Sequence, residues 1–220
     1  GVKGGGTPQN SSANAKALFA YPFGITKRSG SGFYVTDETA GTIRLIDGGN
    51  TKILAGKVFG QSFWDDTGSS AIFNHPAGLL EWPADKSVWI ADRKNHRIRR
   101  LDPKTLSVTT LAGKGKFDPP YVDAKGAAAT LYWPYDLALL HGKQAVFSDD
   151  QLHCLRTLTA DGQVTQIAGK CGQTSNGFND AVNASAKFWH PQGLDSDKKW
   201  TIYVADRGNY VVRKVQCIAW

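Results

Sequence analysis

The chain reads VWIADRKNHRIRRL from Val88 to Leu101, and this stretch decides the fold. Its first half is a β-branched and aromatic run that ends at Asp92, which is typical of a half-buried strand. After a short polar interval, a second run carries Arg99 between apolar neighbours. Two short strands joined in this way predict an antiparallel pair rather than a helix.

The same pattern occurs four times at a nearly fixed spacing. Each copy contains a strand-like run that ends in aspartate, and these aspartates lie 55, 57 and 57 residues apart: Asp37, Asp92, Asp149 and Asp206. Seven residues after each aspartate comes an arginine, which an apolar residue precedes: Arg44, Arg99, Arg156 and Arg213. A proline opens each copy: Pro22, Pro76, Pro134 and Pro191. So many coincident columns at one period identify an internal repeat.

Each repeat predicts four short strands. They follow the proline, end at the aspartate, carry the arginine and end at Ala-Gly, with turn signals such as Asp161-Gly162 between them. Consecutive antiparallel strands in a unit of this length predict one blade of a β-propeller. We therefore expect an all-β fold in a single domain, residues 1–220, with repeats at about 13–56, 67–113, 125–169 and 182–217.

The best-preserved repeat also resembles a known family. The run from Asp92 to Asp102 resembles the NHL signature, in which an aspartate precedes Asn-His-Arg-Ile-Arg, and the residues at 71–79 and 109–113 are similar to the start and end of such a repeat. The fourth repeat keeps the pattern from Asp206 to Lys214, whereas the first and third depart from it. The resemblance covers about residues 13–217 and implies an NHL-repeat β-propeller, a fold that hosts many activities.

The number of blades stays open at this stage. NHL propellers usually have six blades, and the chain stops just after the third strand of its fourth repeat, at Cys217. Gly1 sits about where a fourth strand would end. The sequence therefore predicts either a four-bladed propeller with an incomplete last blade or part of a larger, six-bladed one. Because methionine is absent, we expect a processed chain or a segment of a longer product.

Charge and hydropathy limit the partners. The formal net charge is +7, from 26 Lys and Arg against 19 Asp and Glu, but the basic residues are spread along the chain. A solvated blade edge therefore explains them better than a dedicated nucleic-acid patch. RNA binding through a basic face, as in some NHL propellers, and an acidic glycan remain alternatives. No apolar run approaches the roughly 18 residues of a membrane helix, so we expect no membrane span.

The recurrent charges predict a structural role, because a catalytic residue rarely needs four copies. We expect each arginine to pair with an aspartate of the repeat. A further aspartate column, Asp65, Asp123 and Asp180, is interpreted as a turn or cap feature.

Two histidines are the candidate metal ligands. His75 and His190 occupy the same column, directly before proline, near the expected channel mouth. Imidazole is a common zinc ligand, but two ligands without a third make a poor site. The resemblance includes a zinc-dependent lyase, which leaves a metal-dependent lyase or hydrolase in the central channel as the alternative function. We expect no cofactor, with zinc or calcium as the alternative.

Three cysteines and two sequons point to the compartment. The third and fourth strands of repeat three bring Cys154 near Cys171, which predicts a disulfide and leaves Cys217 free or paired outside this segment. Asn10 and Asn183 begin glycosylation triplets. Together these features predict an extracellular or cell-surface protein.

The function predicted from these residues is a non-enzymatic protein-interaction module with a rigid loop face. No catalytic set is identified. The candidate binding residues lie in connections and beyond the second strands: Arg93, His96, Trp133, Trp189, Arg207 and Tyr210. Exposed aromatic residues with arginine are typical interface anchors.

Overall fold

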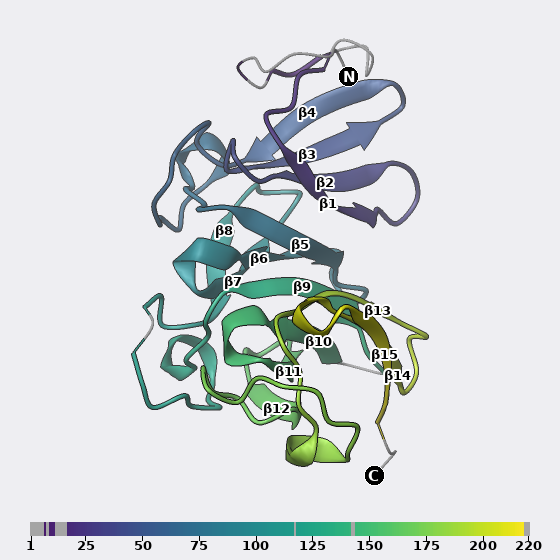
Figure 1. The fold of residues 1–220 in the computed structure, drawn as a ribbon. Helices are drawn as coiled ribbons and strands as arrows, with labels where there is room; N and C mark the ends of the chain where they lie inside the picture. The colour runs from purple at the N-terminus through teal and green to yellow at the C-terminus, as the bar shows by residue number, and fades with distance from the viewer. Residues whose placement is uncertain (1–6, 8, 12–16, 117, 142–143, 218–220) are drawn as a thin grey trace. The chain divides into compact units, whose positions relative to one another are not determined.

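The computed structural model describes residues 7, 9–11, 17–116, 118–141 and 144–217 (Figure 1). Contacts divide the chain into two compact units, which are described separately: unit 1, Gly1–Asn95 with Arg99–Thr109, and unit 2, His96–Ile98 with Thr110–Trp220. Gly1 and the expected start of the first repeat at 13–16 lie outside the described residues. The single domain expected over 1–220 stays a prediction.

Unit 1 contains the first antiparallel sheet, in the order β1-β2-β3-β4, and most of the second, in the order β5-β6-β7-β8. The strands of these sheets are β1 (Pro22–Lys27), β2 (Phe33–Asp37), β3 (Thr42–Asp47), β4 (Asn50–Ala55), β5 (Pro76–Glu81), β6 (Val88–Asp92), β7 (Arg97–Leu101) and β8 (Val108–Ala112). Each of these first strands begins at the proline of its repeat, and each second strand ends at the aspartate, as the sequence predicts.

Unit 2 contains a four-stranded sheet in the order β12-β11-β10-β9 and a three-stranded sheet in the order β13-β14-β15. Their strands are β9 (Pro134–Leu139), β10 (Gln144–Asp149), β11 (Cys154–Thr159), β12 (Val164–Ala168), β13 (Pro191–Ser196), β14 (Thr201–Asp206) and β15 (Val211–Gln216). Every pairing is antiparallel, and β10 meets β11 with Asp149 opposite Cys154. The predicted fold class, NHL-like propeller blades with a three-stranded last blade, is confirmed.

Helical structure in the described residues is limited to single 3-10 turns. They are η2 (Gly68–Ser70), η3 (Arg93–Asn95), η4 (Gly126–Ala128), η5 (Asp150–Leu152), η6 (Asn183–Ser185) and η7 (Arg207–Asn209). None of them is long or apolar enough to cross a bilayer. Three of these turns, η3, η5 and η7, directly follow the aspartate that ends a second strand, and they carry candidate site residues.

Each unit has its own apolar core between neighbouring sheets. In unit 1, Tyr34 and Ile43 of the first sheet pack in one cluster with Phe73 and Ile90 of the second repeat. In unit 2, Leu155 of the third repeat packs with Phe188 of the fourth. The alternation of side chains along each strand thus buries one face of a blade against the next blade in its unit.

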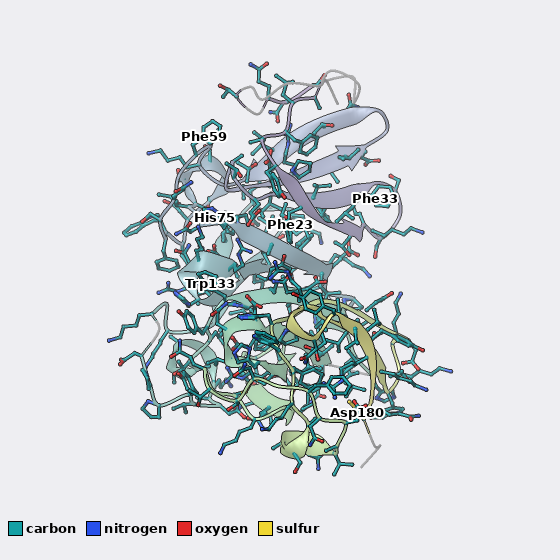
Figure 2. The ribbon with its side chains drawn as sticks, viewed as in Figure 1. Phe23, Phe33, Phe59, His75, Trp133 and Asp180 are labelled. Carbon is teal, nitrogen blue, oxygen red and sulfur yellow. A yellow bond between two sulfur atoms is a disulfide. The ribbon has the colours of Figure 1, made fainter. Side chains whose placement is uncertain are left out.

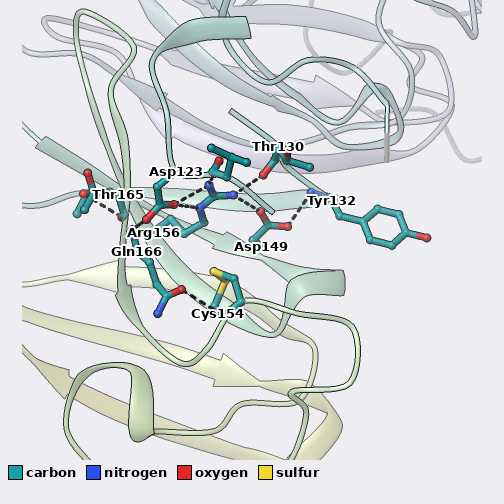
Figure 3. The surroundings of a disulfide bond; sticks show 11 residues. Asp123, Thr130, Tyr132, Asp149, Cys154, Arg156, Thr165 and Gln166 are labelled. Atoms are coloured by element: carbon teal, nitrogen blue, oxygen red, sulfur yellow. Dashed lines mark hydrogen bonds and ion pairs between the residues drawn. A yellow bond between two sulfur atoms is a disulfide. The ribbon is translucent and has the colours of Figure 1, made fainter. Parts of the chain in front are cut away.

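A buried arginine–aspartate pair lies inside each repeat. Arg99 lies 2.7 Å from Asp92, and Arg156 lies 3.1 Å from Asp149, with all four side chains at most 1% exposed. Arg156 also donates to the carbonyls of Thr130 and Val122, at 2.6 and 3.0 Å (Figure 3). The predicted pairing is therefore confirmed, and the guanidinium joins the third strand to the chain that precedes the first strand.

The outer aspartates have a different role from the turn or cap feature that the sequence suggested. Asp65 accepts from Arg99 Nε at 2.9 Å, Asp123 from Arg156 at 2.7 Å and Asp180 (labelled in Figure 2) from Arg213 at 2.7 Å. They are second acids for the buried arginines. Arg99, Arg156 and Arg213 are therefore each shared by two carboxylates, one inside the repeat and one in the connection before it, an arrangement that satisfies several of the five donors of arginine.

The first repeat departs from this arrangement. Arg44 lies 3.6 Å from Asp37, and its Nη atoms donate to the carbonyls of Leu18 and Gln9 in place of a second acid. Its Nε has no hydrogen-bond partner among the described residues. Burial accordingly lowers the pKa of Arg44, with Asp37 opposing the effect.

The predicted disulfide is present. Cys154 at the start of β11 is bonded to Cys171, 17 residues later in the loop after β12. Cys217 is a free thiol that packs against the core of unit 2, and burial raises its pKa.

Candidate functional site: a rim of turns in unit 2

The buried aspartates position the loops that lead into the first strands. While Oδ2 of Asp149 faces Arg156, its Oδ1 accepts the backbone N–H of Tyr132 at 2.9 Å (Figure 3). Asp206 does the same for Trp189, at 2.7 Å. One carboxylate thus fixes both a strand and a loop, so the repeated charges that hold the blades together also orient the loop residues.

These loops and turns adopt unusual backbone conformations. Trp133, His153, His190 and Tyr210 have positive φ angles of 61°, 57°, 51° and 59°. Such values are uncommon outside glycine and persist only where surrounding structure enforces them. The backbone N–H groups of Tyr132 and Trp189 donate to the buried Asp149 and Asp206, and these hydrogen bonds constrain the two loops that precede proline.

Ring contacts and hydrogen bonds connect the turns and loops of unit 2 to one another. The ring of His96 lies 5.2 Å from the ring of Tyr132, and the Trp133 carbonyl accepts the N–H of Asp150 at 3.2 Å. We define the rim strip as the nine residues linked in this way, His96, Tyr132, Trp133, Asp150, His153, Trp189, His190, Arg207 and Tyr210. Trp133, labelled in Figure 2, lies on the loop that leads into β9.

A carboxylate and two imidazoles occupy the centre of the rim strip. Asp150 Oδ1 lies 3.1 Å from His190 Nδ1, and the Asp150 side chain is 4% exposed against 28% for His190. His153 Nδ1 accepts the backbone N–H of His190 at 3.2 Å, and the two rings meet edge to face at 4.7 Å. His153 must therefore be unprotonated at Nδ1, and His190 is held in one orientation.

Burial keeps two of the strip's histidines neutral. It lowers the pKa of His96 to about 4, with Arg97 adding to the effect. Burial, followed by the nearby His190, lowers the pKa of His153. At neutral pH these two rings consequently contribute shape and hydrogen bonding rather than charge.

The far end of the rim strip is open to solvent. Tyr210 is 93% exposed and Trp189 is 41% exposed. Their positions are nevertheless fixed, because the N–H of Gly208 donates to the Trp189 carbonyl at 2.6 Å and Asn209 donates to Asp206 at 2.8 Å. The strip therefore presents exposed aromatic rings on a rigid backbone.

Unit 1 has a counterpart that differs in charge. Arg93, aligned with Arg207, forms an ion pair with Glu38 at 2.5 Å. His75, aligned with His190, lies 3.1 Å from Lys94, and burial and then Lys94 lower its pKa. The structure thus brings five of the six binding candidates together in unit 2 and places Arg93 in a neutralised pair in unit 1.

Sequence reasoning missed Asp150 and His153 as site residues. Asp150 and His153 lie in the degenerate third repeat, whose residues depart from the signature. Their positions relative to the repeat aspartate could have identified them. Asp150 directly follows that aspartate, as Glu38 does, and His153 lies four residues after it, as His96 and Tyr210 do.

The candidate metal ligands are not brought into one cluster within either unit. His75 belongs to unit 1, where its ring contacts Asn74 and Lys94, and His190 belongs to unit 2, where its ring contacts Asp150 and Gln151. Within the described residues, no group of three or more His, Cys, Asp or Glu is arranged to hold a metal ion. The role of these histidines as metal ligands remains an untested prediction.

Curated proteins with similar sequences carry the same repeat. The human and bovine proteins named NHL repeat-containing protein 2 are each 33% identical over 119 residues, 49% of this chain. The chain belongs to the NHL-repeat β-propellers. An Arabidopsis thaliana protein, SUPPRESSOR OF QUENCHING 1, chloroplastic, is 32% identical to this NHL chain over 162 residues, 69% of its length. No family model matches it.

The NHL chain spans a small part of these relatives, 14% of the Arabidopsis protein and 16% of the human and bovine ones.

Among solved structures, an auxiliary nutrient binding protein of Bacteroides thetaiotaomicron superposes with a TM-score of 0.68 at 23% identity, over 87% of this chain and 46% of that one. A second protein of that organism, of unknown function, gives 0.71 at 16% identity, over 89% and 47%. These likenesses show the fold alone.

Proposed function

We propose that this NHL propeller chain is a protein-interaction module and that the rim strip is its recognition surface. One observation carries the proposal. Exposed Trp189 and Tyr210 lie beside Arg207 on turns that hydrogen bonds hold rigid. Tyr, Trp and Arg are the residues most enriched at energetically important interface positions, and rigid backbone lowers the entropy lost on binding.

The proposal is tested by cross-linking from defined positions. A photoreactive phenylalanine analogue at position 210 should capture a partner from the protein's native source. The same analogue at position 203 is the matched control, because Tyr203 is 47% exposed on β14 of the same unit but outside the rim strip. A captured protein supports the proposal only if Tyr210→Ala and Trp189→Ala then lower its measured affinity. Capture from position 203 alone, or affinity unchanged in both variants, would contradict it.

We further propose that the protein is extracellular or on the cell surface. The Cys154–Cys171 disulfide supports this, because such bonds persist mainly in oxidising compartments. Asn183 is exposed at the start of η6, and Asn10 is exposed, although Ser12 of its sequon lies outside the described residues.

Secretion from a eukaryotic host tests this proposal. A glycan removed by a peptide-N-glycosidase and absent from Asn183→Gln supports it. An unmodified Asn183 in efficiently secreted protein would contradict the predicted glycosylation.

A further inference from the structure

We propose that the rim strip recognises an acidic protein segment and that Arg207 receives its carboxylate. This inference rests on the proposed function and names the chemistry of the partner. It starts from a difference between two aligned arginines in the same chain.

Arg93 and Arg207 occupy the same position, directly after the buried aspartate of their repeats. In unit 1, Glu38 of the preceding repeat pairs with Arg93 at 2.5 Å. In unit 2, the aligned acid is Asp150, and its carboxylate lies against His190 at 3.1 Å. Arg207 is exposed and forms no ion pair with any described residue. Glu38 therefore neutralises Arg93, whereas the aligned Asp150 pairs with His190 and not with Arg207.

The turn that carries Arg207 is fixed on both sides. The neighbouring Gly208 packs so closely on Trp189 that an added Cβ would lie 2.5 Å from the ring. Asn209 donates from Nδ2 to Asp206 and to the carbonyl of Gly177, both at 2.8 Å. The backbone that supports the guanidinium is thus preorganised, and exposed aromatic rings lie on the same turns.

A planar guanidinium can bind a carboxylate through two parallel hydrogen bonds. The aromatic rings of Trp189 and Tyr210 offer apolar contact on the same turns. The geometry therefore suits a side chain of Asp or Glu that lies next to an apolar residue in a partner.

A protein segment fits better than RNA. Arg207 is the only permanently charged cation of the rim strip as defined, and burial holds His96 and His153 neutral. Strong binding of a nucleic acid rests on several phosphate contacts made by Lys and Arg. One cation with aromatic anchors provides too few such contacts, whereas it is sufficient for a single carboxylate.

The test uses displayed 12-residue peptides as probes and the 220-residue chain as the target. The tightest peptide is then synthesised with its acidic residue and with the isosteric amide. We expect selected peptides to contain Asp or Glu, and Arg207→Gln to weaken the acidic peptide about 10- to 100-fold, as for other hydrogen bonds to charged groups. The amide peptide should bind wild-type protein as weakly as the acidic peptide binds Arg207→Gln.

Arg93→Gln is the matched control, and it should leave peptide affinity unchanged, with thermal unfolding used to confirm that each variant is folded. Equal losses of peptide affinity in the two arginine variants would overturn acid recognition. So would a tight peptide that contains no Asp or Glu but binds Tyr210→Ala more weakly than wild type. Either result would leave the proposed interaction module unaffected. Selected peptides indifferent to Tyr210→Ala and Trp189→Ala would instead overturn the module. Displacement of the peptide by a 12-nucleotide single-stranded RNA, lost steeply with added salt, would contradict a protein partner.

Discussion

Replacing Arg156 by methionine removes a cation that lies between two carboxylates and is 1% exposed. The substitution leaves Asp149, itself fully buried, without its partner at 3.1 Å. Breaking a buried pair from one side costs about 3–5 kcal/mol. In a protein of this size, that loss lowers the melting temperature by about 6–20 °C, at roughly 2–4 °C per kcal/mol.

Urea unfolding followed by tryptophan fluorescence measures this loss. Arg100→Met is the control, because Arg100 pairs with Asp85 at a site where both side chains are 42% exposed, and such pairs contribute about 0–1 kcal/mol. The penalty for Arg156→Met should shrink at low pH, because a protonated Asp149 carries no buried charge, and burial raises the pKa of this carboxyl group while Arg156 opposes that shift. Equal losses in the two variants would refute the view that buried pairs hold the blades.

Three further predictions concern individual positions. Burial raises the pKa of Asp136 to about 6, so the contribution of this carboxyl group to the unfolding free energy should fall as pH rises from 4 to 7; the difference between wild type and Asp136→Asn in urea titrations at each pH should change by about 1–3 kcal/mol over that range. Replacing Cys154 and Cys171 by serine opens a 17-residue link and should lower stability by about 3 kcal/mol in the same assay. Gly208→Ala forces a contact with Trp189 and should cost about 1–3 kcal/mol while weakening partner binding.

Much of the fold could be predicted because it repeats. Pro76, Asp92 and Arg99 each mark a fixed place in a blade, so their spacing determines where strands begin, end and carry a buried cation. The second acid, such as Asp65, was misinterpreted because 34 residues separate it from Arg99, and sequence spacing alone does not show that contact.

The rim strip was harder to predict, since its centre depends on contacts between repeats. Asp150 meets His190 across 40 residues of sequence. The position directly after the repeat aspartate alternates in charge, which could have indicated this contact. It is acidic in repeats one and three, at Glu38 and Asp150, and basic in repeats two and four, at Arg93 and Arg207. The same alternation places hydroxyls at Thr36 and Ser148, which donate to the next repeat at 2.7 and 2.6 Å.

Hydrogen–deuterium exchange of the chain, alone and saturated with its selected peptide, tests the central claim most directly. Recognition by the rim strip predicts slower exchange at residues 96, 132–133, 150–153, 189–190 and 207–210, with unit 1 unchanged. Protection confined to the β-strands of unit 1, or to the turn around Arg93, would contradict it.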